Sequence, residues 1–190
     1  MAGGRDSLGQ NENKASSSMT TPAIPRRAGG TVLALAILAS CEGGAPLGGD
    51  DFQARYAAAR GALEEGRFEV ARNLYPPLIA AAGPVAPRLR LEYAHTLLRD
   101  GDFGGAEHEA DVVARGTDGD ARAAALAVRG TAQHEIGEAL LAAGEPAAAE
   151  LRLAAAREAL RQVLDSDADL DPLGAMTRRL DDIEALLSSL

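Results

Sequence analysis

A short glycine-centred pattern recurs along this sequence. Gly-x-Phe-x-x-Ala occupies positions 66–71 and again positions 101–106, which begin 35 residues later. A third copy begins at Gly144, 43 residues further on, and keeps the alanine but has Pro146 in place of phenylalanine. Glycine readily adopts the left-handed backbone conformation that ends many helices. The pattern therefore predicts a tight turn that recurs between pairs of helices.

Apolar residues on both sides of each glycine recur at three- and four-residue steps, which is typical of one face of a helix. In each pair, we expect the phenylalanine to fill the turn and the alanine to let the second helix close onto the first. The apolar positions before the glycines are Tyr56, Ala59 and Leu63, then Leu91, Ala94, Leu97 and Leu98, then Ile136, Leu140 and Leu141; those after are Ala71, Leu74 and Leu78, then Ala106, Ala110 and Val113, then Ala149, Leu153, Ala156 and Leu160.

The composition agrees with close-packed helices. The 190 residues include 41 Ala and 25 Leu, whereas aromatic residues make up only 3 %. This favours an all-α fold over a β-sandwich, which needs β-branched and aromatic side chains. A single cysteine excludes an intrachain disulfide. The formal net charge of −9 argues against binding nucleic acid, which requires a basic surface.

On the Gly-x-Phe-x-x-Ala pattern, the chain resembles the tetratricopeptide repeat, a helix–turn–helix unit of about 34 residues. The resemblance implies a right-handed α-solenoid of about three such repeats over residues 51–190, with a C-terminal capping helix. The first helix of the third repeat is expected to be long, over residues 119–143.

Two further expectations concern individual helices. Pro76 and Pro77 fall inside the second helix of the first repeat, where proline removes a hydrogen bond and clashes with the preceding turn. We therefore expect a kink or a break at residues 75–77. The capping helix is expected to start after Asp171, with Pro172 in its first turn. Its apolar stripe would comprise Leu173, Met176, Leu180, Ile183 and Leu187.

The first 41 residues have the order of parts found in an export signal. A pair of arginines at 26–27 precedes an uncharged run of 14 residues, 28–41, which is too short to span a membrane. The run ends in Leu38-Ala39-Ser40-Cys41, which resembles the lipobox of bacterial lipoproteins. The resemblance implies that Cys41 is lipidated and becomes the mature N-terminus. The alternative is that Cys41 is a buried core cysteine.

The domain organisation follows from this interpretation. Residues 1–40 would be a lipoprotein signal peptide, with Met19 as a possible true start, and residues 41–50 a flexible tether. Removing residues 1–40 leaves 150 residues with 15 basic and 26 acidic side chains, a net charge of −11. As the resemblance implies, Glu42 after the cysteine favours the periplasmic face of the outer membrane.

Two segments suggest metal binding but depart from the motifs they resemble. Asp165, Asp167, Asp169 and Asp171 alternate as in a calcium loop, yet the required glycine and distal glutamate are missing. The segment 134–138 begins like a zinc-protease helix but has Glu138 where the second histidine is needed. We expect no metal, no cofactor and no catalytic site.

The resemblance places the first helix of each repeat along a concave groove. The partner-binding positions implied are Tyr56, Arg60 and Leu63, then Arg88, Leu91, His95 and Arg99, then His134, Glu138 and Leu141. The alternative is that these arginines are merely solvated.

The sequence as a whole indicates a non-enzymatic, lipid-anchored adaptor of the bacterial cell envelope. It would hold an envelope protein or peptide in this groove, in the assembly of an envelope complex. One alternative is a periplasmic lipoprotein that binds a small molecule between helical hairpins. Another, if the lipobox is fortuitous, is a cytoplasmic helical adaptor.

Overall fold

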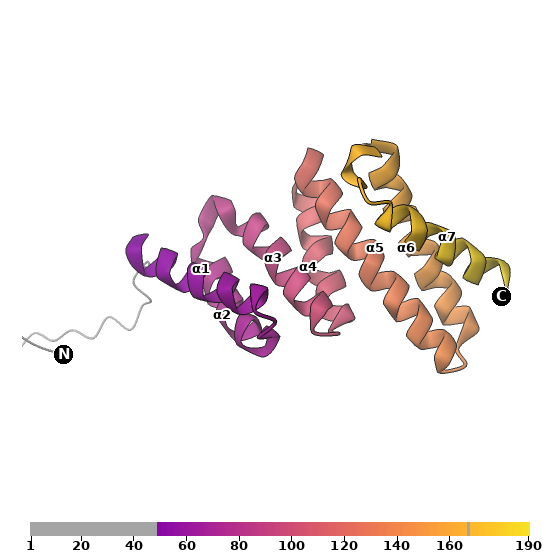
Figure 1. The fold of residues 1–190 in the computed structure, drawn as a ribbon, viewed down its shortest axis with the longest axis horizontal. Coiled ribbons are helices and arrows are strands. Elements are labelled where there is room, and N and C mark those ends of the chain that lie inside the picture. Colours follow the sequence, from indigo (N-terminus) through magenta and orange to yellow (C-terminus); the bar gives the residue numbers. More distant parts are fainter. Residues whose placement is uncertain (1–48, 167) are drawn as a thin grey trace, which may run out of the picture. The chain divides into compact units, whose positions relative to one another are not determined.

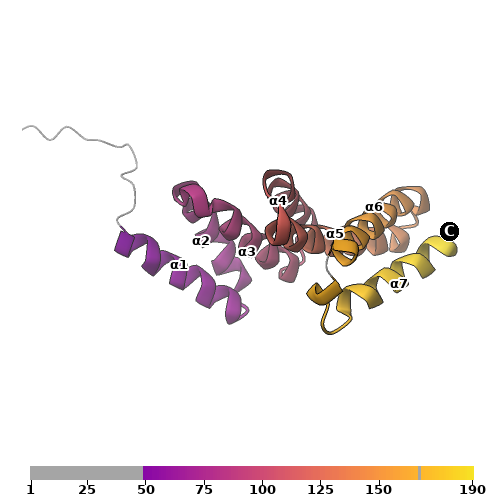
Figure 2. The same ribbon diagram turned by 90° about the horizontal axis from the view of Figure 1, so that it is seen from above.

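The computed structural model describes residues 49–166 and 168–190, and these residues are all-α, with no strand among them. Each helix packs mainly against the helices that adjoin it in the chain, and α3 also contacts α5 (Figure 1, Figure 2). The fold class predicted from composition is therefore confirmed. The α-helices are α1 (Gly49–Glu64), α2 (Phe68–Ala81), α3 (Ala86–Arg99), α4 (Phe103–Gly116), α5 (Gly119–Ala142), α6 (Pro146–Ser166) and α7 (Ala175–Ser188), with 3-10 turns η1 (Gly83–Val85) and η2 (Ala168–Leu170).

The three glycines of the recurring pattern lie in the turns after α1, α3 and α5. Gly66, Gly101 and Gly144 all have positive φ, between 74° and 81°, as predicted for residues that end a helix. The alanines that follow them, at 71, 106 and 149, are fully buried at the start of the next helix. The short side chain therefore lets each second helix approach the first, as the pattern predicted.

Two glycines within α5 mark its closest approach to α6. A Cβ atom at Gly137 would lie 2.7 Å from Cγ of Leu153, and one at Gly130 would lie 2.9 Å from Cγ of Leu160. Both leucines are fully buried. The long first helix expected over residues 119–143 is observed as α5, and these glycines explain how it packs tightly along its length.

Of the kink or break expected at residues 75–77, the break does not occur, because α2 continues from Phe68 through both prolines to Ala81. Pro76 and Pro77 are exposed, whereas Tyr75, Leu78 and Ile79 are buried. The apolar packing of these neighbours thus outweighs the two backbone hydrogen bonds that the prolines cannot donate.

The start of the C-terminal helix also differs from the expectation. Asp171 does cap it, since its carboxylate accepts hydrogen bonds from the backbone N–H groups of Met176 (3.0 Å) and Thr177 (2.8 Å). However, α7 begins at Ala175, after Gly174 in the left-handed conformation. Pro172 therefore precedes the helix, and Leu173 is 81 % exposed rather than part of the apolar stripe.

Candidate partner-binding groove

A hollow of about 300 Å³ lies between α1 and α3, and it contains four of the predicted groove residues. α1 contributes Arg60, Leu63 and Glu64, and α3 contributes Glu92, His95 and Arg99. Residues one helical turn apart share a face, so the spacing of Arg60 and Glu64, and of His95 and Arg99, places each pair on one side of its helix. Polar side chains from two helices thus line one hollow, and Leu63 forms its apolar floor.

Glu92 organises the polar contacts beside this hollow. The hydroxyl groups of Tyr56 and Tyr75 donate to its two carboxylate oxygens at 3.0 and 3.1 Å. Arg88 and Arg60 donate to the same carboxylate at 3.3 and 3.5 Å. With a side chain only 15 % exposed, Glu92 joins α1, α2 and α3 through these donors.

The hydroxyl of Tyr75 is the most deeply placed donor in this cluster, and the residue is fully buried. Burial, reinforced by the negative charge of Glu92, raises the pKa of Tyr75 well above its usual value near 10. Tyr75 therefore stays protonated as a hydrogen-bond donor, which matches its role as a fixed support for Glu92.

Arg99 differs from the other arginines of the hollow, because none of the described carboxylates forms an ion pair with it. Its guanidinium lies 4.8 Å from the centre of the Phe68 ring and donates to the carbonyl of Leu63 at 3.4 Å. By contrast, Arg60 pairs with Glu64 at 2.8 Å. The hollow thus holds two guanidinium groups and two carboxylates, with Arg88 beside it on Glu92, so it is less acidic than the chain as a whole.

The third group of predicted positions does not join this hollow. His134 is buried, with only 4 % of its surface exposed, and lines a separate hollow of about 350 Å³ between α5 and α7. Glu138 is exposed in that same hollow, with a carboxylate oxygen 4.0 Å from Nε2 of His134. The structure therefore brings four of the predicted residues of α1 and α3 together in one hollow but places those of α5 elsewhere.

Arg179 of α7 fills the space next to His134. Its Nη1 donates to Nδ1 of His134 at 2.7 Å and to Glu135 at 2.9 Å. Burial lowers the pKa of His134, and the charge of Arg179 adds to this effect, while nearby carboxylates oppose it. The donor atoms of His134, Glu135 and Glu138 lie within 4.8 Å of one another, but this acidic cluster already holds a guanidinium cation.

Two apolar positions predicted for the groove serve mainly in packing. Leu91 packs against Val113, Ala110 and Val128 of α4 and α5, and Leu141 packs against the cluster of Leu153 and Leu160. Cys41, the predicted lipidation site, lies outside the described residues.

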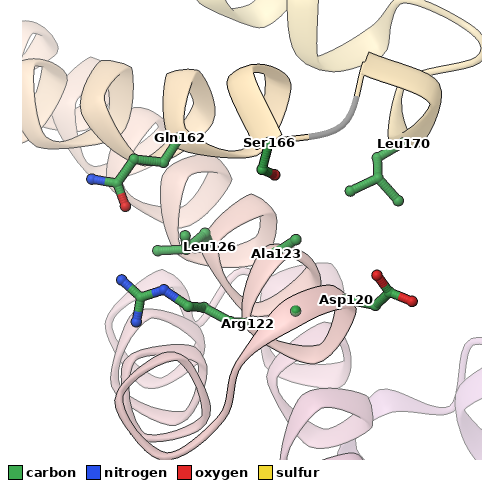
Figure 3. A pocket seen from close by; sticks show the side chains of 8 residues that line it. Asp120, Arg122, Ala123, Leu126, Gln162, Ser166 and Leu170 are labelled. Carbon is green, nitrogen blue, oxygen red and sulfur yellow. The ribbon is translucent and has the colours of Figure 1, made fainter.

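A further hollow, of about 420 Å³, lies between the start of α5 and the end of α6 (Figure 3). Figure 3 shows Arg122 and Leu126 on one side and Gln162, Ser166 and Leu170 on the other. Arg122 is engaged within the protein, because its guanidinium donates to the carbonyl of Ala114 at 2.5 Å. This hollow was not anticipated from the sequence, since its two sides are some 40 positions apart and share no motif.

Comparison with protein families, with curated proteins and with solved structures finds no match to this chain. Among the described residues, no helix combines the length and the apolar character needed to cross a bilayer.

Sequence reasoning missed two side chains that organise these sites. Glu92 had a detectable signal, because it is the only acidic residue in a helix that carries Arg88, Arg90, His95 and Arg99. Arg179 had none, since it lies 45 residues from the histidine that it contacts.

Proposed function

We propose that this protein is a non-enzymatic, lipid-anchored adaptor of the bacterial cell envelope, which binds a segment of an envelope protein in the groove between α1 and α3. The observation that carries the proposal is the hollow itself, where Arg60, His95 and Arg99 converge from two helices above Leu63. A mixed apolar and charged surface of this kind suits a peptide segment better than a small apolar ligand.

We also propose that the helices form tetratricopeptide-like repeats in a right-handed α-solenoid, with α7 as the terminal cap. Three turn glycines of positive φ and the buried alanines after them support this assignment. The exposed face of α7 carries Thr177, Arg178, Asp181 and Asp182, and repeat proteins need such a polar outer face at their ends.

Capture of partners from solubilised membranes tests the groove. We expect wild-type protein to retain a stoichiometric envelope partner, and His95→Trp, which fills the hollow with an exposed side chain, to lose it. The matched control is Gln162→Trp, which fills the hollow between α5 and α6 instead. Equal retention by wild type and His95→Trp would place the partner outside the groove. Loss with Gln162→Trp alone would place the partner at the second hollow, and capture of no stoichiometric protein by wild type would favour the small-molecule alternative.

Fractionation tests the anchor. The protein and its Cys41→Ser variant are expressed in a Gram-negative host, and the membranes are separated by density. We expect wild type in the outer membrane, labelled by a fatty-acid analogue, and the variant without label. A label that survives Cys41→Ser would contradict lipidation at this residue, and wild type confined to the cytoplasm would favour the cytoplasmic alternative.

A further inference from the structure

The C-terminal helix α7 covers an apolar face formed by α5 and α6. Ile183, the one buried residue of α7, packs in a cluster with Leu153 and Leu160, all fully buried. Two polar contacts supplement this packing: Glu184 pairs with Arg161 of α6, and Arg179 binds His134 and Glu135 of α5. The packing of Ile183 and these two charged contacts therefore keep the face beneath α7 out of contact with water.

The contact between Arg179 and His134 requires a neutral imidazole. Arginine is only a donor, so Nδ1 of His134, at 2.7 Å from Nη1, must be the acceptor. The proton of the neutral ring then lies on Nε2, which is buried and has no hydrogen-bond partner. A second proton, on Nδ1, would point its N–H at the N–H of Arg179. It would also place the imidazolium cation next to the guanidinium cation.

The charged groups around His134 come from two helices. Its own helix contributes Glu135 and Glu138, and α7 contributes Arg179 and Asp182, with Arg178 at the rim of the same hollow. The carboxylates favour the charged ring, whereas burial and Arg179 oppose it. The opposing effects prevail and lower the pKa of His134, so the ring is neutral at pH 7 and takes up a proton only in acid.

We propose that His134 and Arg179 form an acid-sensitive latch, in which protonation of His134 releases α7 and uncovers the apolar face of α5 and α6. In acid, the imidazolium turns its Nε2 proton toward Glu138, which is exposed and 4.0 Å away. Arg179 then keeps only Glu135 as a partner on α5. The face uncovered is the side of the Leu153 and Leu160 cluster against which Ile183 packs, whereas the side against Gly130 and Gly137 of α5 stays covered.

Hydrogen exchange of the full chain at about pH 7.5 and pH 5, corrected for the intrinsic effect of pH, tests the latch. We expect protection of the α7 amides, relative to those of α2, to fall about tenfold at the lower pH. His134→Gln should remove this pH dependence, because its amide oxygen can accept from Arg179 but does not titrate. The matched control, His108→Gln, changes an exposed histidine of α4 outside the latch and should keep the wild-type pH dependence of α7 protection.

Unchanged α7 protection in acid, or the same loss in His134→Gln as in wild type, would overturn the proposal. If His134→Gln does not fold, the Glu138→Gln variant tests the latch instead. Removing a carboxylate that favours the imidazolium should move the loss of α7 protection to lower pH, and an unmoved transition would equally overturn the latch.

Discussion

At the scale of the residue, glycines within helices of this protein differ in the space around them, so an added methyl group would have opposite effects on stability. Gly137 lies where α5 contacts α6, and a methyl group there would overlap Leu153, which is fully buried. Gly61 lies in the last turn of α1, with nothing within 4 Å of the position its Cβ would take.

We therefore expect Gly137→Ala to lower the free energy of unfolding by about 1–2 kcal/mol, since the overlap outweighs the gain in helix propensity. Gly61→Ala should raise it by up to about 1 kcal/mol. Urea unfolding of both variants measures the difference. A stabilising Gly137→Ala would mean that α5 and α6 can separate without loss.

The raised pKa of Tyr75 makes a prediction for alkaline pH. The folded state favours the protonated phenol, so its contribution to stability is complete below the unfolded pKa of about 10 and is lost as pH rises toward the higher folded value. We expect urea unfolding at about pH 11 to require less denaturant than at pH 9. Tyr75→Phe should weaken this dependence, leaving the smaller contribution of Tyr93, whose pKa burial also raises. An unchanged dependence in Tyr75→Phe would contradict the assignment.

At the scale of the element, the prolines of α2 test how much tertiary packing holds a helix. Pro77 leaves the carbonyl of Asn73 without its helical donor and is exposed, so its ring contributes little to the core. Pro77→Ala should raise the free energy of unfolding by about 1–3 kcal/mol, measured by urea unfolding. A loss of stability would show that proline sets a bend needed to place Tyr75 on Glu92.

The presence of the helices could be predicted from the sequence, because turns and helix faces depend on residues close together in the chain. The spacing of Gly66, Gly101 and Gly144 located three turns, and α5 begins at the residue expected. Two local signals misplaced a helix boundary. Burial of Tyr75, Leu78 and Ile79 keeps α2 from breaking at its two prolines, and α7 begins after Gly174 rather than at Pro172.

The candidate sites were predictable only within helices adjacent in the fold. Arg60, His95 and Arg99 meet because α1 and α3 lie next to each other, as the repeat pattern implied. His134 is on α5, which also precedes a turn glycine, but α7 covers it through Arg179. No periodicity reveals which polar residue of a terminal helix will reach across to a histidine.

At the scale of the whole molecule, the described helices form a chain of neighbouring interfaces rather than one shared core. The apolar cluster of Tyr75, Leu78 and Leu89 joins α1, α2 and α3, whereas that of Leu153, Leu160 and Ile183 joins α6 and α7. Stability in such an arrangement is close to a sum of local terms, so distant parts can unfold separately.

This arrangement makes a prediction about cooperativity. Tyr75→Ala removes a fully buried aromatic side chain and the donor to Glu92, which should cost about 3–5 kcal/mol within α1–α3. Hydrogen exchange should then show lost protection in α1–α3, while amides of α5 and α6 near Leu153 and Leu160 keep theirs. Leu160→Ala, the matched change at the other end, should give the reverse pattern. Uniform loss in both variants would mean that the helices unfold as a single cooperative unit, because local interfaces cannot then be stable without their distant neighbours.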